Sequence, residues 1–365
     1  MTALGELPTP CLVLDRDRLE ANLARMAKRA KRLGVALRPH VKTHKCIEIA
    51  RRQIEHGALG ITVSTLYEAR TFAEHGFDDI VWAFPVILGR LGEVVELASR
   101  IRFGVVVDSR KAVDALESLA VDLGVWLKVD SGYHRAGVDP MGELAVELAE
   151  RLASSGTLSF AGLLSHSGHA YACKEDSEVR AIAAQERSCM VLLGQRLSLK
   201  GVTVPAISVG STPTMTRVES LPGVSEARPG NYALFDHTQV VLGSCAASEC
   251  AATVLSTVVS VPEGAQHSVI DAGALALSVE ASHPLAPQAS MGEIYQDYDR
   301  GRLADDLRVT SVSQEHGIVS GRLKVGERVR ILPNHSCLAV ACYDQAWVVE
   351  GEAVVGRWKI HRGRD

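Results

Sequence analysis

Several features that mark other protein classes are missing from this chain. No apolar run approaches the length of a membrane-spanning helix. The first ten residues, MTALGELPTP, lack the basic and apolar regions of a signal peptide. The net charge is only -4 and is spread along the chain, so neither a nucleic acid nor a membrane is expected as a partner. We therefore expect a cytoplasmic protein.

The cysteines form no CxxC pair, although the chain has eight of them. A chain of 365 residues does not need disulfides for stability, so most of these cysteines are expected to be small buried residues in a reducing compartment. Internal repeats and low-complexity tracts are also missing. The length suits one large domain plus a smaller one, and a hydrophobic content of 47% is ample for their cores.

The first two thirds of the chain alternate short β-branched runs with segments of helical period. Setting aside the run CLVLD at 11–15, eight runs remain, at residues 35–41, 59–63, 79–84, 101–107, 125–130, 160–166, 205–210 and 224–230. Each is followed by a helical pattern or by room for one. Eight such units within about 250 residues favour a closed (β/α)8 barrel of parallel strands, with an open doubly wound sheet as the alternative.

After about residue 237 the helical period fades. Runs such as ATVLSTVVSV and QAWVVEGEAVVGRW alternate with turn residues, which indicates a β-rich region of roughly antiparallel character. We therefore predict two domains, a barrel at 8–236 and a C-terminal β domain at 237–365. The strand at 11–15 could also belong to the β domain.

In a barrel of this kind, reactive residues gather at the carboxyl ends of the strands. Lys42 follows the first barrel strand, between two histidines on alternate positions. The segments DSGYHRAGV, HSGHAY, GSTPT and RPGNY follow the fifth, sixth, seventh and eighth strands. In GSTPT, residues Gly210, Ser211 and Thr212 offer backbone N–H groups and hydroxyls of the kind that hold a phosphate.

A lysine and a phosphate-binding turn at one barrel mouth could hold pyridoxal phosphate as a Schiff base on Lys42. The lysine must lose its proton for this, and we expect the nearby imidazoles and Arg38 to depress its pKa. Arg135 in DSGYHRAGV could approach the phenolic oxygen of the cofactor, because a guanidinium is always charged and directional. The alternative for Arg135 is an ordinary surface arginine.

The ordered set RPHVKTHK, DSGYHRAGV, HSGHAY, GSTPT, RPGNYALFD, DAGALALS, QEHG and PNHSC resembles one known family. This is the D-serine dehydratase and D-threonine aldolase family of fold-type III pyridoxal phosphate enzymes, related to alanine racemase. The resemblance runs from Pro8 to about Trp358. It implies an alanine-racemase-like (β/α)8 TIM barrel, a C-terminal β domain, a head-to-tail homodimer and a divalent metal beside the cofactor. Lys42, the first lysine of KTHK, matches the Schiff-base lysine of the family.

The segment PNHSC contains the predicted metal ligands. His335 and Cys337 are two residues apart, so both point to one side of an extended segment. An imidazole and a thiolate suit Zn²⁺ in a tetrahedral site with open positions. The pair matches the metal pair of the dehydratase branch, whereas the aldolase branch carries histidine and aspartate, which suit Mn²⁺ or Mg²⁺ better.

The resemblance implies a lyase that depends on pyridoxal phosphate and zinc and acts on D-β-hydroxy amino acids. In the D-serine dehydratase reaction, Lys42 is also the general base, the metal assists departure of the β-hydroxyl, and the products are a 2-oxo acid and ammonia. The first alternative is aldolase cleavage of D-threonine or 3-hydroxy-D-aspartate to glycine and an aldehyde. Two others are an amino-acid racemase and a non-catalytic cofactor carrier, and the H-x-C pair in a β domain argues against the carrier.

Other residues carry weaker expectations. We expect Tyr171 to line the cofactor ring, Tyr232 to donate its hydroxyl to the phosphate, and His166 to lie at the cofactor, although a structural role is equally open for His166. The roles of His169, Glu315 and His316 stay open. The sequence also leaves open which D-β-hydroxy amino acid is the substrate.

Overall fold

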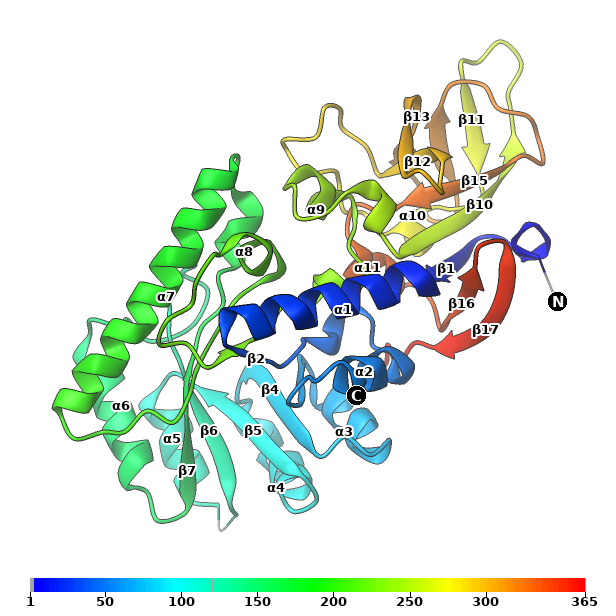
Figure 1. The fold of residues 1–365 in the computed structure, drawn as a ribbon. Coiled ribbons are helices and arrows are strands. Elements are labelled where there is room, and N and C mark those ends of the chain that lie inside the picture. Colours follow the sequence, from blue (N-terminus) through cyan, green and yellow to red (C-terminus); the bar gives the residue numbers. More distant parts are fainter. Residues whose placement is uncertain (1–2, 120, 365) are drawn as a thin grey trace. The chain divides into compact units, whose positions relative to one another are not determined.

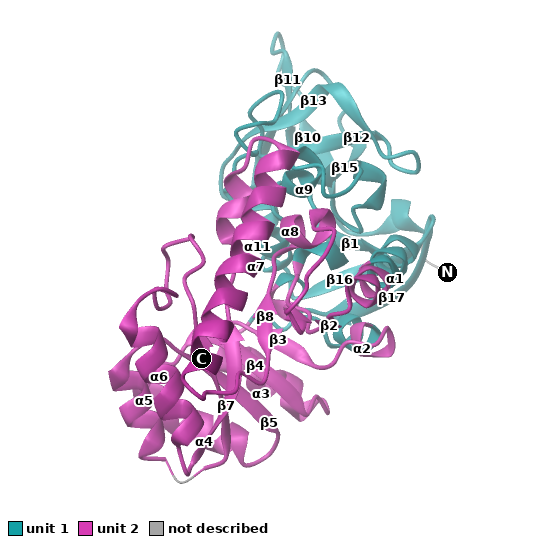
Figure 2. Cartoon of the chain, turned by 60° about the vertical axis from the view of Figure 1, so that its left-hand side comes forward, with its two compact units in different colours: residues 1–25, 43–52, 231–362 teal, residues 26–42, 53–230, 363–365 magenta. Residues whose placement is uncertain are grey.

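The chain divides into two compact units. The computed structural model describes residues 3–119 and 121–364. Unit 1 is built from Met1–Arg25, Thr43–Arg52 and Asn231–Arg362, and unit 2 from Met26–Lys42, Gln53–Gly230 and Gly363–Asp365 (Figure 2). Each unit is therefore assembled from segments that lie far apart in the sequence.

Unit 2 contains a sheet of eight parallel strands in the order β2-β9-β8-β7-β6-β5-β4-β3. The strands are β2 (Ala36–Leu37), β3 (Ile61–Val63), β4 (Asp79–Pro85), β5 (Arg102–Val107), β6 (Leu123–Lys128), β7 (Leu158–Leu164), β8 (Ile207–Val209) and β9 (Glu226–Ala227). The sheet curls until its two edges meet. A parallel bridge joins His40 to Thr62, and the Thr62 N–H donates to the Pro39 carbonyl at 2.8 Å, so the segment after β2 pairs with β3. The predicted barrel of eight parallel strands is confirmed.

Helices follow the barrel strands and flank the sheet (Figure 1). Those wholly within unit 2 are α3 (Leu66–Glu74), α4 (Leu91–Ala98), α5 (Arg110–Glu117), α6 (Glu143–Ser154), α7 (Asp176–Leu199) and α8 (Thr212–Arg217), while α1 (Arg16–Leu33) and α2 (Ile47–Glu55) contribute residues to both units. Thr65 begins α3 by accepting the Glu68 N–H, and Ser109 begins α5 by accepting the Ala112 N–H. Strands β5 and β6 are apolar along most of their length, as expected for parallel strands covered on both faces.

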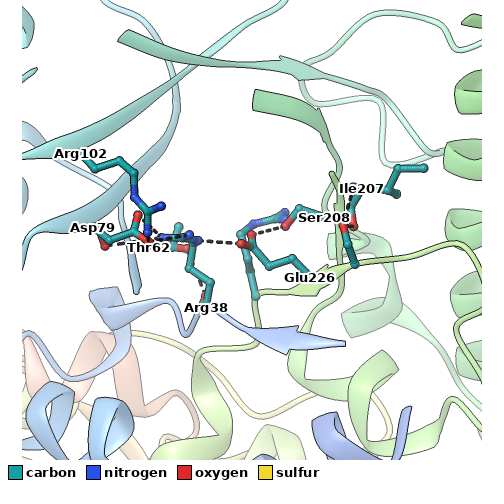
Figure 3. Close-up of polar contacts among 9 residues, drawn as sticks. Arg38, Thr62, Asp79, Arg102, Ile207, Ser208 and Glu226 are labelled. Atoms are coloured by element: carbon teal, nitrogen blue, oxygen red, sulfur yellow. Dashed lines mark hydrogen bonds and ion pairs between the residues drawn. The ribbon is translucent and has the colours of Figure 1, made fainter. Parts of the chain in front are cut away.

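A buried ion pair joins strands across the barrel interior (Figure 3). The Nε–H of Arg38 donates to Glu226 at 2.7 Å, and its two terminal nitrogens donate to the carboxylate of Asp79 at 2.7 and 3.0 Å. Arg102 also contacts Asp79, and the Ser208 hydroxyl donates to Glu226 at 2.6 Å. The positive charge of Arg38 is therefore matched by two carboxylates inside the sheet.

Unit 1 contains a nine-stranded sheet in the order β11-β14-β13-β12-β15-β10-β1-β16-β17. Its strands are β1 (Cys11–Asp15), β10 (Ala252–Ser260), β11 (His267–Ile270), β12 (Gly292–Asp297), β13 (Arg302–Val312), β14 (Gly317–Ser320), β15 (Arg328–Leu332), β16 (Gln345–Glu350) and β17 (Ala353–Lys359). The predicted β-rich region of antiparallel character is confirmed, since β1 and β16 are the only parallel pair among the described strands of this sheet. The CLVLD strand, β1, lies inside this sheet between β10 and β16.

Each unit has an apolar core of its own. In unit 2 one buried cluster joins four strands and consists of Val81, Val106, Trp126 and Leu164. In unit 1 one buried cluster packs between the strands and the short helix α10 (Ala274–Leu277), with Val254, Ile270, Ile294 and Ile331 among its members. Two further short helices of unit 1 are α9 (His237–Val241) and α11 (Ser336–Val340). Among the described residues, no helix combines the length and the apolar character needed to cross a membrane.

Candidate active site

A cavity of about 350 Å³ in unit 2 brings several predicted site residues together. Its lining consists of His40, Lys42, Ser64, Ala83, Phe84, Pro85, Lys128, Arg135, Ala136, Leu164, His166 and Arg228. These residues stand at the carboxyl ends of the barrel strands or in the loops that follow them. The cavity therefore lies at the end of the barrel where catalytic residues are expected.

Three residues singled out from the sequence face this cavity: Lys42, Arg135 and His166. Lys42 lies in a single turn of 3₁₀ helix, Val41–Thr43, that follows β2. Burial, reinforced by Lys42 and the other nearby cations, holds the pKa of His166 well below its usual range. The imidazole of His166 is therefore neutral at pH 7, and it can give or accept a hydrogen bond without carrying charge.

Two further cations of the cavity were not identified from the sequence. Lys128 is the last residue of β6 and is 8% exposed, and Arg228 follows β9 and is buried. Burial, together with Arg228, lowers the pKa of Lys128 to about 7, and burial lowers the pKa of Arg228 to about 10. Arg228 donates to the Ser208 hydroxyl and to the Ser165 carbonyl, which are both uncharged. None of the lining residues is acidic, so the cavity suits an anion.

The expectation for Arg38 needs correction. We expected Arg38 to act beside Lys42 and depress its pKa. The structure pairs Arg38 with Asp79 and Glu226 instead, so its charge is compensated and it does not line the cavity. A strand-end arginine is indistinguishable from a site residue in the sequence, because its two acidic partners are 41 and 188 residues away.

Arg135 is held by the loop that follows β6. The carboxylate of Asp130 accepts the N–H groups of Gly132 and His134 at 3.0 Å and lies 2.9 Å from the His134 ring. Burial would raise the pKa of Asp130, but these hydrogen bonds lower it. The guanidinium of Arg135 lies over the ring of Tyr133, 4.8 Å from its centroid. These contacts orient Arg135, whose side chain reaches the cavity.

The predicted phosphate-binding residues lie at the start of α8. Gly210 has φ +97°, a conformation that suits glycine, and its N–H donates to Glu186 at 3.2 Å. The Ser211 N–H donates to the Thr214 hydroxyl at 2.9 Å. Gly210, Ser211 and Thr212 are not among the residues that line the cavity. Their contact with a phosphate stays a prediction.

Glu186 of α7 joins the loops that follow β7 and β8. Its carboxylate is 1% exposed and accepts the hydroxyls of Ser165 and Ser167, both at 2.7 Å, in addition to the Gly210 N–H. Three donors around one buried carboxylate fix the start of α8 relative to β7. Sequence reasoning missed this role, because Glu186 is one acidic residue on a long helix of mixed charge.

The two predicted tyrosines lie in different units. Tyr171 belongs to the 3₁₀ helix Gly168–Ala172 of unit 2, but it does not line the cavity. Tyr232 belongs to the 3₁₀ helix Asn231–Ala233 of unit 1 and is 1% exposed. Contacts of Tyr171 with the cofactor ring and of Tyr232 with the phosphate stay predictions.

His335 and Cys337 lie side by side in unit 1 at the start of α11, where a hydrogen bond joins their side chains. Burial would lower the pKa of His335, but the Cys337 sulfur and the carboxylates of Asp236 and Glu280 raise it to about 9. Glu280 lies 3.9 Å from the His335 Nδ1 atom. A carboxylate beside an imidazole is the usual arrangement around a metal-binding histidine.

The surroundings of Cys337 add two polar groups. The Cys337 sulfur lies 3.4 Å from the hydroxyl of Thr43, the residue that follows Lys42 in the chain. The amide nitrogen of Asn231 is 4.0 Å from the same sulfur and donates to Asp236 at 2.6 Å. The side-chain Oδ1 atom of Asn231 is buried, and no described residue donates a hydrogen bond to it.

These groups fit a metal that is held by few protein ligands. Among residues 3–119 and 121–364, no three or more His, Cys, Asp and Glu side chains are gathered for a metal ion. His335 and Cys337 therefore offer one imidazole and one thiolate. The Asn231 Oδ1 atom beside them accepts no hydrogen bond from the described residues. A zinc ion on this pair would keep positions open for water or substrate.

Two family models match the chain. The model described as alanine racemase, N-terminal domain, matches residues 14–237. The model described as putative serine dehydratase domain matches residues 251–349. The two models together span both the barrel strands and most of the nine-stranded sheet.

Curated relatives match the chain over nearly its whole length. D-threo-3-hydroxyaspartate dehydratase of Delftia sp. (strain HT23) is 34% identical and the match covers 98% of both chains. D-serine dehydratase of Dictyostelium discoideum is 32% identical over 96% of this chain and 95% of its own. D-threonine aldolase of Arthrobacter sp. is 30% identical over 98% of this chain and 93% of its own.

Solved structures agree with these matches. A cysteine-to-alanine mutant of D-threo-3-hydroxyaspartate dehydratase, in the metal-free form, superposes with a TM-score of 0.94 at 32% identity over 100% of both chains. Alanine racemase of Clostridium difficile superposes with a TM-score of 0.67 at 14% identity, covering 96% of this chain and 98% of that one. The second match shows the alanine-racemase fold, with its barrel and β domain, and nothing more specific.

Proposed function

Because the chain belongs to the alanine racemase-like family whose members include D-serine dehydratase and D-threonine aldolase, we propose that it is a pyridoxal phosphate-dependent lyase of D-β-hydroxy amino acids. The proposed reaction is a zinc-dependent β-elimination of the D-serine dehydratase type, giving a 2-oxo acid and ammonia. The observation that carries the proposal is the cationic cavity with Lys42 at the barrel mouth.

The cavity residues fit the cofactor. Lys42 would carry pyridoxal phosphate covalently, and Arg228 is a buried guanidinium of the kind that partners the pyridine nitrogen. Arg135 would hold the phenolic oxygen, next to the neutral imidazole of His166. Gly210, Ser211, Thr212 and Tyr232 would hold the phosphate, and Tyr171 would line the ring.

Lys42 also has a second task in the proposed reaction. Pyridoxal phosphate supplies the electron sink that stabilises negative charge on the substrate Cα atom. The Nζ atom of Lys42 would take the Cα proton as general base, and the surrounding cations would favour its neutral form. The apolar wall formed by Phe84 and Leu164 would limit the access of water to this atom.

The predicted metal pair would assist the departure of the β-hydroxyl group. Hydroxide departs poorly at neutral pH, and zinc on His335 and Cys337 would supply the Lewis acidity that favours its departure. Manganese or magnesium is the alternative ion, but the thiolate of Cys337 favours zinc. We also propose a cytoplasmic homodimer, with small D-amino acids as its ligands.

The decisive test is product analysis before and after chelation. Purified protein is incubated with D-serine, D-threonine and D-threo-3-hydroxyaspartate, and ammonia, 2-oxo acid and glycine are measured. We expect ammonia and oxo acid in equal amounts, loss of both after chelation, and better recovery with Zn²⁺ than with Mn²⁺.

Cys337→Ala should behave like the chelated protein, and Cys342→Ala, at a partly buried cysteine outside the proposed metal pair, serves as the matched control. Ammonia release from a metal-free protein would contradict the role of the metal. Glycine as the main product would assign the chain to the aldolase reaction.

A further inference from the structure

Lys128 is a buried cation without a counter-ion. It ends β6 and faces the same cavity as Lys42, and its side chain makes no hydrogen bond or ion pair within the part of the chain that the structure describes. A buried ammonium without a counter-ion destabilises the folded protein. A ligand that brings a negative charge would compensate this cost.

The two carboxylates that act on Lys128 are already engaged. Glu186 accepts two serine hydroxyls and the Gly210 N–H. Asp130 accepts two backbone N–H groups and contacts the His134 ring. Neither carboxylate forms an ion pair with Lys128, and no acidic residue lines the cavity.

The other cations of the cavity have tasks in the proposed reaction. Lys42 is assigned to the covalent link, Arg135 to the phenolic oxygen and Arg228 to the pyridine nitrogen. The pyridine nitrogen assigned to Arg228 carries no negative charge, so the single carboxylate of D-serine would match only one of the two charges on Arg228 and Lys128. A substrate with a second carboxylate would bring the charge that the site lacks.

We propose that Lys128 binds the side-chain carboxylate of the substrate, so that the preferred substrates are D-β-hydroxy dicarboxylic amino acids rather than D-serine. This inference rests on the proposed lyase function and narrows its substrate class. D-threo-3-hydroxyaspartate, the compound for which the Delftia relative is named, has the required second carboxylate. The depressed pKa of Lys128, about 7, fits a cation that becomes fully charged when an anion arrives.

The experiment compares two substrates in the holoenzyme. Steady-state kinetics are measured with D-threo-3-hydroxyaspartate and with D-serine for the parent protein, Lys128→Met, Lys128→Arg and the exposed-site control Lys111→Met. Lys128→Met should lower kcat/KM for the dicarboxylate about 100-fold, and that for D-serine less than about fivefold. Lys128→Arg keeps the charge and should retain the preference of the parent protein, and Lys111→Met should match the parent throughout.

A binding measurement separates substrate recognition from chemistry. D-aspartate and D-alanine lack the leaving hydroxyl, so each is tested as an inhibitor of D-serine turnover. Lys128→Met should raise the inhibition constant of D-aspartate about 100-fold and leave that of D-alanine nearly unchanged. The unchanged D-alanine constant also shows that the variant is folded and loaded with cofactor.

The pH dependence gives an independent readout. The titratable groups that line the cavity with Lys128 or act on its charge are His40, Lys42, Asp130, Arg135, His166, Glu186 and Arg228. In the parent protein, kcat/KM for the dicarboxylate relative to D-serine should fall as the pH rises through about 7, because Lys128 loses its proton. In Lys128→Met this ratio should not change with pH.

Equal losses for both substrates and both inhibitors would overturn the proposal, because they would place Lys128 at the cofactor. An unchanged inhibition constant for D-aspartate in Lys128→Met would overturn it as well. Release of glycine in place of ammonia would refute the proposed elimination instead, and the two inhibition constants would still decide whether Lys128 binds the second carboxylate.

Discussion

Replacing Arg38 with methionine should destabilise the barrel of unit 2 by about 3–5 kcal/mol, because the change leaves charges uncompensated inside the sheet. The Arg38 side chain is 5% exposed, and its three nitrogens donate to Glu226 and Asp79 at 2.7 to 3.0 Å. Methionine fills much of the same volume but donates no hydrogen bond. The native state then keeps two desolvated carboxylates without their shared cation.

In Arg38→Met the two carboxylates differ in the partners that they keep. Asp79 still contacts Arg102, whereas Glu226 keeps the Ser208 hydroxyl, which carries no charge (Figure 3). Adding Glu226→Gln to Arg38→Met should therefore recover about 1–3 kcal/mol of the free energy of unfolding. Adding Asp79→Asn should recover less, because Arg102 already compensates that carboxylate.

Urea unfolding, monitored by circular dichroism, measures these differences. The cofactor is removed from all variants, because a ligand that binds only the native state adds to the apparent stability. Arg102→Met is the control, since this side chain is 72% exposed and a surface pair contributes less than about 1 kcal/mol. A loss of stability in Arg38→Met as small as that in Arg102→Met would contradict the role of Arg38 as a buried counter-ion, and so would the absence of any recovery with Glu226→Gln.

Two further predictions concern the cofactor. Borohydride should fix the cofactor on the peptide that contains Lys42. Lys42→Ala should lose this adduct, and its turnover number should fall by several powers of ten. Mass spectrometry that finds the adduct on Lys45 would contradict the assignment. Glu186→Gln should weaken cofactor binding about tenfold in a fluorescence titration, because the start of α8 loses part of its anchor. The exposed Glu150→Gln is its control, and equal affinity in the two variants would show that Glu186 does not position the phosphate-binding turn.

The parallel sheet could be predicted because its strands are short apolar runs that alternate with helical segments, and the count of eight such units favoured a closed barrel over an open doubly wound sheet. Lys42 stood out as a lysine between two histidines at a strand end, and the family resemblance matched it to the Schiff-base lysine, an assignment that stays a prediction. His335 and Cys337 were selected through the family resemblance, because an H-x-C pair alone is a weak signal. The spacing argument assumed an extended segment, whereas Cys337 lies in the first turn of α11. Features that depend on neighbours in sequence were therefore accessible.

The residues that were missed depend on distant parts of the chain. Lys128 ends an apolar strand just as Lys42 follows one, but nothing next to it in the sequence shows that it is buried among other cations. Glu186 becomes a positioning residue only through Ser165, Ser167 and Gly210, which reach it from two loops. Arg38 and Arg228 look alike as strand-end arginines, and only the barrel interior gives one two carboxylates and the other uncharged acceptors.

The place of β1 has a consequence for how the protein is made. Cys11–Asp15 leaves the ribosome before the barrel strands, but its neighbours in the sheet, Ala252–Ser260 and Gln345–Glu350, are synthesised after the whole barrel. An apolar strand therefore stays unpaired while eight other strands emerge and close on one another, which exposes it to wrong partners on the way. No single cut in the backbone releases the two units as whole pieces, because β1 precedes the barrel in the chain and the other strands of its sheet follow the barrel.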